Sequence, residues 1–227
     1  MSERTLERRL GDGCTFFAEA VGNMNECPLI PDDIREHLAA HAPKTVLAVN
    51  LKHAMVGISL VESRLCRSFV GFESSPLLHV TALLSDARMT SAVTYVNAIV
   101  GERFGFTQQR IPCCVSDTAL GEDIEDVGTI LTPTISLDGY LYKRASAAPL
   151  YALWIGEEKL VPHLSLGAID TLSHTALVIV ETNTKQSGGS TRGEMLRYFA
   201  DLGFYLSEPE QANNWGRVYF HRRGSTP

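Results

Sequence analysis

The order of the strand-like stretches constrains the fold of this chain more than any other sequence feature. A doubly wound parallel sheet requires strands and helices to alternate along the sequence. Apolar stretches that predict strands instead follow one another closely: 45–51, 55–61, 77–84, 111–115, 129–137, 150–155, 160–169, 175–181 and 215–223. Residues 64–72 fit either a strand or a loop. The sequence therefore predicts an α+β fold with antiparallel sheets.

Helices are expected at four places. Residues 2–24 carry apolar side chains at near-helical spacing, and residues 31–41 carry acidic side chains in their first turn. Residues 90–104 place Val93, Val96, Ile99 and Val100 on one stripe, which predicts an amphipathic helix. A last helix is capped by Ser190 or Thr191, ends at Asp201 and is followed by Gly203.

Two of the predicted strands each carry a histidine and, two positions later, a hydroxyl residue. They contain His79 with Thr81 and His163 with Ser165. Side chains alternate along a strand, so each pair would present an imidazole and a hydroxyl on one face. One imidazole could act as base and the other as acid, while the hydroxyls bind the oxygens of a phosphate. Histidines hydrogen-bonded within sheets are the structural alternative.

Composition and net charge limit the kinds of partner and the cellular location that we expect for this chain. A formal net charge of −6 argues against broad binding along nucleic acid, which needs a basic surface. No apolar run is long enough to span a bilayer, so no membrane partner is expected. Five irregularly spaced cysteines and a charged N-terminus favour reduced thiols and a cytoplasmic location.

Motifs for other chemistry are missing from the sequence. It contains no G-x-x-x-x-G-K-[ST], G-x-G-x-x-G, G-x-S-x-G, CxxC or H-E-x-x-H, so no cofactor and no metal are expected. His37 and His41 lie four residues apart, a spacing that can hold a metal, but surface histidines are the preferred interpretation. Cys113 and Cys114 are interpreted as structural thiols, with a cysteine hydrolase as a minor alternative.

The two histidine segments resemble the motifs of the 2H phosphoesterase superfamily, the LigT-like phosphodiesterases. Leu78–Leu83 is similar to the first motif and Val161–Leu166 to the second. The resemblance implies two pseudo-symmetric lobes around a central groove, each with an antiparallel sheet. It also implies metal-independent hydrolysis of 2′,5′-oligoadenylate, a cyclic dinucleotide or a 2′,3′-cyclic phosphate, as in members that degrade immune signals. RNA 3′-end processing and a non-catalytic nucleotide-binding module remain alternatives.

Further expectations follow from this resemblance. Catalysis would fall to His79, Thr81, His163 and Ser165, and the partner would be a small nucleotide or oligonucleotide. Aromatic and cationic side chains could contact that substrate, and the candidates are Tyr140, Tyr142, Arg144, Arg217 and Tyr219. Residues 1–43 would form a helical extension, and 44–223 the catalytic domain, with lobes of 44–130 plus the last strand and of 131–214. The oligomeric state is left open.

Overall fold

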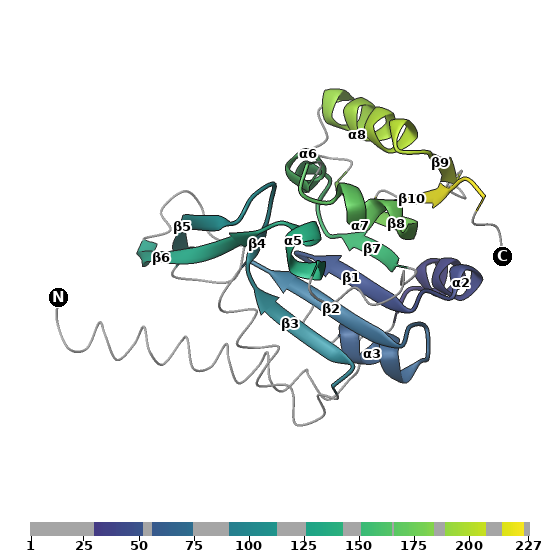
Figure 1. Cartoon of the computed structure of the whole chain (residues 1–227), viewed down its shortest axis with the longest axis horizontal. Helices are drawn as coiled ribbons and strands as arrows, with labels where there is room; N and C mark the ends of the chain where they lie inside the picture. The colour runs from purple at the N-terminus through teal and green to yellow at the C-terminus, as the bar shows by residue number, and fades with distance from the viewer. Residues whose placement is uncertain are drawn as a thin grey trace.

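A mixed seven-stranded sheet forms the centre of the protein in the computed structural model (Figure 1). The structure describes residues 30–51, 56–74, 91–112, 126–142, 151–164, 166–183, 189–207 and 215–224. The described strands of this sheet have the order β3-β2-β1-β7-β8-β10-β9. Its strands are β1 (Thr45–Val49), β2 (Ser68–Glu73), β3 (Val93–Asn97), β7 (Tyr151–Ile155), β8 (Thr175–Asn183), β9 (Phe204–Ser207) and β10 (Trp215–Arg222).

Most neighbouring strands of the main sheet run parallel. Strand β1 pairs in parallel with β2 and β7, β2 pairs in parallel with β3, and β7 with β8. Only β10 runs against its neighbours, β8 and β9. The α+β expectation with antiparallel sheets and two lobes is therefore wrong, because parallel neighbours are joined by crossovers on the faces of one sheet.

Helices cover both faces of the main sheet. Helices α2 (Asp32–His41) and α3 (Val56–Glu62) bury their apolar side chains against one face. The opposite face is covered by α5 (Leu137–Leu141), α6 (Val161–Leu164), α7 (Ile169–Ser173) and α8 (Gly189–Asp201). Alternate residues of β1 divide accordingly: Leu47 and Val49 face the second set of helices, and Val46 and Ala48 the first. This three-layer arrangement buries the sheet on both sides.

A second, three-stranded sheet projects from the carboxyl end of β3. Its strands are β4 (Ile99–Val100), β5 (Gly105–Pro112) and β6 (Asp126–Ile135), in the order β4-β6-β5. Strands β5 and β6 form a long antiparallel ribbon, seen at the left of Figure 1. We call this ribbon the arm.

Several sequence predictions are confirmed. The structure has helices α2 and α8 and strands β1, β6, β7, β8 and β10 close to their expected positions. Ala42 ends α2 and Gly203 follows α8, both with positive φ. The predicted helix 2–24 and the predicted strand 77–84 lie outside the described residues. The predicted domain boundaries stay a prediction.

Three segments differ from expectation. Residues 56–62 form α3, because β1 and its parallel neighbour β2 require a crossover between them. Residues 93–100 form β3 and β4 instead of a helix, because sheet pairing with β2 and β6 overrides the helical spacing. Residues 158–164 form a 3₁₀ turn (η2, Glu158–Leu160) and α6 where the second histidine strand was expected.

Candidate functional site at the carboxyl edge of the sheet

The carboxyl ends of β1 and β7 mark the point where the strand order reverses. The chain passes from β1 outward to β2 and β3, and later returns to place β7 on the other side of β1. Folds of this type bind their ligands outside the carboxyl ends of the strands at such a switch point. The two ends are held together closely, since Gly156 N–H donates to the carbonyl of Val49 at 2.9 Å. A Cβ on Gly156 would lie 2.1 Å from the carbonyl oxygen of Asn50.

The turn after β1 is built around Asn50. Its φ of 52° is in the left-handed region, which asparagine tolerates better than most side chains. The Asn50 backbone N–H donates to the carbonyl of Phe72 at 2.8 Å, and its Oδ1 accepts from Ser74 N–H at 3.1 Å. These bonds tie the carboxyl ends of β1 and β2 together, so Asn50 shapes the turn that a glycine makes in nucleotide-binding loops.

Helix α3 begins just beyond this turn and packs directly on β2. A Cβ on Gly57 would lie 2.3 Å from Cδ1 of Phe69, so only glycine allows this approach of helix and strand. Close helix–strand packing is one of the roles of glycine in the loop that follows the first strand of dinucleotide-binding folds.

An acidic residue ends β2. Glu73 is partly buried at the carboxyl end of that strand. Its carbonyl accepts from Asn97 Nδ2–H at 2.9 Å and from Ala98 N–H at 3.2 Å, which fixes the end of β3 beside it. A carboxylate at this position, roughly 20 residues beyond the first strand, binds ribose hydroxyls in dinucleotide-binding folds.

More acidic side chains follow β7. Glu157 Oε2 lies 2.5 Å from Lys159 Nζ, and Glu158 is buried with one carboxylate oxygen lacking a hydrogen-bond partner among the described groups. The described part of the chain contains no group of three or more His, Cys, Asp or Glu placed to hold a metal ion. The edge therefore offers carboxylates and backbone groups that can bind hydroxyls and amines.

The predicted catalytic residues are only partly described. His79, Thr81 and Ser165 lie outside the described residues, as does the predicted substrate contact Arg144. His163 is exposed and belongs to α6, so alternation along a strand does not apply to it. The expected strand geometry of the second motif is wrong, while the assignment of site roles to these residues stays a prediction.

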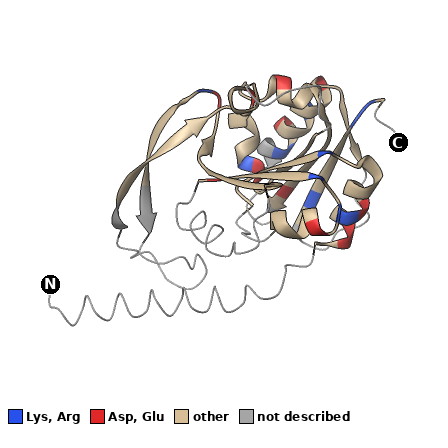
Figure 2. Ribbon diagram, turned by 60° about the horizontal axis from the view of Figure 1, so that its bottom comes forward, with Lys and Arg blue, Asp and Glu red and all other residues tan. Residues whose placement is uncertain are grey.

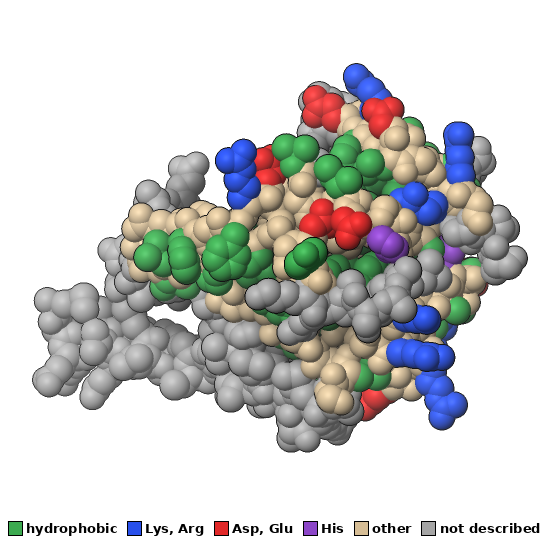
Figure 3. Space-filling model, in the orientation of Figure 1, with side chains coloured by type: hydrophobic (Ala, Val, Ile, Leu, Met, Phe, Trp, Pro, Cys, Tyr) green, Lys and Arg blue, Asp and Glu red, His purple; other side chains and the backbone are tan. Residues whose placement is uncertain are grey.

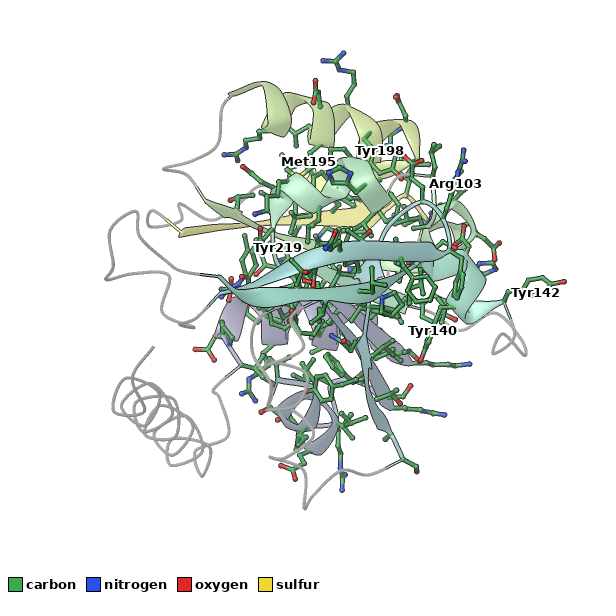
Figure 4. All side chains as sticks on the ribbon, turned by 90° about the vertical axis from the view of Figure 1, so that its left-hand side faces the viewer. Arg103, Tyr140, Tyr142, Met195, Tyr198 and Tyr219 are labelled. Atoms are coloured by element: carbon green, nitrogen blue, oxygen red, sulfur yellow. The ribbon has the colours of Figure 1, made fainter. Side chains whose placement is uncertain are left out.

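The two predicted tyrosines do not form one platform. Tyr140 lies in α5, where its ring meets Phe72 edge-on at 5.0 Å between centroids, and Tyr142 follows the helix with 84% of its surface exposed. Residues two apart on a helix point in different directions. Figure 4 shows both well apart from Tyr219, and Tyr140 and Tyr219 pack on opposite faces of the main sheet.

Arg217 and Tyr219 lie close together, but both contact Asp33, a carboxylate of the protein itself, where a substrate was expected. Tyr219 Oη donates to Asp33 Oδ2 at 2.5 Å, and Arg217 lies 3.2 Å from the same oxygen and 3.5 Å from Glu181 Oε1. Burial opposes ionisation of Asp33, yet the Tyr219 hydrogen bond and the Arg217 charge hold its pKa below the usual value. The contacts join α2 to β8 and β10. They lie at the same edge of the sheet as the carboxyl ends of β1 and β7, because Arg217 pairs with Glu181, one residue beyond the level of Ile155 and Val49.

Three histidines lie beside this contact, and we call them the histidine cluster: His37, His41 and His221. His41 Nε2 and His221 Nδ1 are 2.6 Å apart, and the His37 ring stacks on Tyr219 with 3.8 Å between centroids. Burial lowers the pKa of His221 to about 4, with the neighbouring His41 and His37 adding to the effect. The cluster links helix α2 to β10.

The order and direction of the strands, with helices on both faces, define a Rossmann-like α/β fold. The structure is similar to a protein of the NADB-Rossmann superfamily from Streptococcus agalactiae, with 13% identity, a TM-score of 0.52 and coverage of 86% of this chain and 69% of that one. It is also similar to a Streptococcus pneumoniae protein described as a tRNA (m1A22) methyltransferase, in complex with S-adenosyl-L-methionine. That match has 12% identity, a TM-score of 0.50 and coverage of 86% and 73%. The sequence itself matches no protein-family model and no curated protein.

These findings correct the resemblance drawn from the histidine segments. A Rossmann-like sheet is not the two-lobed fold of 2H phosphoesterases, so the expected membership, phosphodiesterase activity and nucleotide-signal hydrolysis are wrong. The short H-x-[ST] pattern had suggested a common fold that the chain does not have. Among the described helices, none has the length and apolar character needed to cross a membrane.

Sequence reasoning missed Asn50, Glu73, Asn97 and Gly156. One signal was available: the apolar run Phe69–Phe72 ends at an acidic residue after an earlier buried strand. That pattern indicates a site only if residues 68–73 form a strand parallel to β1. The sequence alone fits either a strand or a loop there.

Proposed function

We propose that the protein is an S-adenosyl-L-methionine-dependent methyltransferase whose cofactor site lies at the carboxyl ends of β1, β2, β3 and β7. The observation that carries this proposal is Glu73, whose carboxylate ends β2 beside the switch point. In this place a carboxylate can accept hydrogen bonds from both ribose hydroxyls of an adenosine. The similar fold of a structure that holds the same cofactor supports the choice of adenosylmethionine.

The described residues around the edge fit such a ligand. Asn50 makes the tight turn after β1, and Gly57 allows α3 to start close to the sheet. Asn97 and the backbone of Ala98 fix β3 next to Glu73, where they can flank an adenine. When bound, the cofactor would supply an electrophilic methyl group on a sulfonium. The protein's own part is to hold the ribose at Glu73 and to orient the ligand across the switch point.

One sequence feature favours a second candidate function, nucleoside binding without methyl transfer. None of the residues from Asn50 to Val56 is glycine, and Lys52, His53 and Met55 carry large side chains. In dinucleotide-binding loops a glycine here lets the backbone approach the ligand closely. A bulkier loop could still bind the adenosine half at Glu73 while presenting the methionine half less productively.

Calorimetric titration of the full chain with S-adenosyl-L-methionine and S-adenosyl-L-homocysteine tests the proposed site. We expect binding, and we expect Glu73→Gln to weaken it about tenfold or more, because a hydrogen bond to a charged group contributes about 1.5–3 kcal/mol. Glu62→Gln is the matched control, since this exposed carboxylate ends α3 away from the switch point. No binding at millimolar ligand, or equal affinity in Glu73→Gln, would refute the site.

Turnover separates the two candidate functions. Release of S-adenosyl-L-homocysteine is measured over hours with small RNAs, peptides and small hydroxyl or amine compounds as acceptors. Binding with acceptor-dependent release supports the methyltransferase. Binding without release for any acceptor supports the second candidate.

A further inference from the structure

Carboxylates are concentrated at the carboxyl ends of the main sheet. Five acidic side chains end a strand, follow one closely or contact a neighbour at that level, and we call them the acidic edge: Glu73, Glu157, Glu158, Glu181 and Asp33. Asp33 belongs to this edge because its Oδ2 lies 3.2 Å from Nη1 of Arg217, whose strand position pairs with Glu181. Lys159 Nζ lies 2.5 Å from Glu157 Oε2, so both of these cations are already held by carboxylates.

Glu158 has an unused hydrogen-bond acceptor within this edge. It follows β7 at the switch point, its exposed fraction is 9%, and its Oε2 has no hydrogen-bond partner among the described groups. A buried carboxylate oxygen without a partner is costly, so a donor is expected there. An ammonium group supplies several N–H donors together with the opposite charge. The position therefore suits a positively charged ligand.

The surroundings do not neutralise the acidic edge. Other described charges in the adjoining segments come in opposite pairs along the sequence: Asp32 with Arg35, Glu102 with Arg103, and Arg192 with Glu194. Outside the described residues, the loops that leave the carboxyl ends of β1, β2, β8 and β9 contain both signs equally: Lys52, Arg88 and Lys185 against Asp86, Glu208 and Glu210. In the arm, Arg110 is outnumbered by Asp117, Glu122, Asp123, Glu125 and Asp126. An excess of negative charge therefore remains.

Cations gather instead at the amino ends of the strands. Arg67 N–H donates to the carbonyl of Lys44 at 3.0 Å where β1 and β2 begin, and Arg222 Nε–H donates to the carbonyl of Thr175 at 2.9 Å where β8 begins. Figure 3 shows Lys and Arg side chains gathered at the right, away from the arm, and the described part of the arm in Figure 2 is tan beyond its base. A phosphate chain that approaches the carboxyl ends would therefore meet negative charge, which slows its association and weakens its binding.

We propose that the methyl acceptor is a cationic amine, an ammonium group of a small polyamine or of a lysine side chain, held at the acidic edge with Glu158 among its hydrogen-bond acceptors. This substrate class rests on the proposed function. Methylation of such a nitrogen removes one N–H bond. The proton passes through a carboxylate to water, and the freed lone pair forms the new N–C bond while the C–S bond breaks and its electrons stay on sulfur. The amine keeps its positive charge, so the acidic edge accommodates the product as well.

Calorimetric titration of the full chain tests this substrate class without depending on turnover. The probes are spermidine, trilysine amide, the fully acetylated form of each, and a short oligouridylate, with and without S-adenosyl-L-homocysteine. We expect one of the two amines to bind, and to bind more weakly as salt is added. The acetylated probes, which lack the positive charge, and the oligouridylate should bind about tenfold more weakly or less. Release of S-adenosyl-L-homocysteine from S-adenosyl-L-methionine should follow the same order, and it identifies the source of the ammonium group.

Two variants locate the bound amine. Glu158→Gln keeps the shape of the side chain and removes its charge, and Glu181→Gln does the same on β8. Each should weaken amine binding about three- to tenfold. The matched control is Glu62→Gln, which removes an equal charge from an exposed residue that ends α3 before the amino end of β2. It should bind the amines like the unmodified chain, and thermal unfolding checks that each variant is folded.

Several results would overturn the inference: no binding of either amine, equal binding of the acetylated probes or the oligouridylate, or a loss of affinity in Glu62→Gln as large as in the acidic-edge variants. Binding of S-adenosyl-L-homocysteine is a separate readout. If the chain binds it and methylates the oligouridylate, the substrate class is wrong and the proposed function stands. If the chain binds the amines through Glu158 but not S-adenosyl-L-homocysteine, the proposed function is refuted and the acidic edge stands as an amine site.

Discussion

Acid should loosen the contact between helix α2 and β10, and the histidine cluster sets the size of the effect. His221 is buried, its Nδ1 contacts His41 Nε2, and its Nε2 has no partner among the described groups. Its pKa is lowered to about 4 from an ordinary value of 6.5, first by burial and then by the charges that His41 and His37 would carry. The folded state therefore keeps this imidazole neutral.

The sign and size of the pH effect follow from this difference. Below pH 6.5 the unfolded chain takes up a proton at residue 221 and the folded chain does not, so folding stability falls as the pH falls toward 4. At pH 5 the loss is about 2 kcal/mol, and near pH 4 about 3 kcal/mol. His37 and His41, whose pKa values are also lowered by burial, act in the same direction.

Asp33, the acidic group beside the histidine cluster, does not reverse this trend. Asp33 on α2 has a pKa below its ordinary 3.8, so the stability it contributes is lost only in more acidic solution. Glu36 lies near His37, and Tyr205 of β9 stacks on His221. Arg217 contacts Asp33 on one side and Glu181 on the other.

Urea unfolding at pH 7.5 and pH 5 measures the effect. The free energy of unfolding of the unmodified chain should fall by about 2 kcal/mol or more between these values. In His221→Phe that fall should shrink by about 2 kcal/mol, whatever the variant's stability at pH 7.5. The matched control is His174→Gln, a change at a half-buried histidine that follows α7 and lies outside the histidine cluster. An equal fall in His221→Phe and the unmodified chain would refute the reasoning.

Two further predictions concern packing, one at the candidate site and one between α5 and α7. Gly156→Ala should destabilise the fold by about 1–3 kcal/mol in urea unfolding, because its Cβ would lie 2.1 Å from the Asn50 carbonyl oxygen. Gly105→Ala, with open space around it, should change stability by less than about 0.5 kcal/mol, and equal effects would contradict the clash. Asp138→Asn should cost about 1–2 kcal/mol, because the Asp138 carboxylate accepts from Thr171 N–H at 2.8 Å and from its hydroxyl at 2.7 Å. An unchanged urea midpoint for Asp138→Asn would show that this cap contributes nothing measurable.

The sequence predicted the strands of the sheet better than their direction. Buried strands such as Thr45–Val49 and Tyr151–Ile155 are continuous apolar runs, and such runs are recognisable without any partner. Direction depends on the connections. Helix α3 is a short segment with five buried residues in succession, so it has no polar face to reveal it as a helix. When α3 is interpreted as a strand, no helical crossover remains between β1 and β2, and the sequence no longer indicates that these strands are parallel.

The site was harder to predict than the fold. The histidine–hydroxyl pairs attracted attention because their residue types suit acid–base chemistry, yet the second pair falls in a turn of helix. Asn50 and Glu73 are common residue types that indicate a site only once β1 and β2 are known to be parallel neighbours, because their carboxyl ends then lie side by side. A single-sequence pattern can therefore name reactive residue types, but the switch point that selects among them is a property of the sheet order.

The position of β10 has a consequence for how the chain acquires its structure during synthesis. This strand enters the sheet between β8 and β9, although it follows both in the sequence. In the described structure β9 pairs only with β10, so β9 cannot form its backbone hydrogen bonds in the sheet until residues 215–222 have left the ribosome. The antiparallel strand also carries His221 and Tyr219, which contact α2. The nascent chain therefore completes the contacts of α2 only with its last described strand, and until then that edge of the sheet can pair wrongly with other chains.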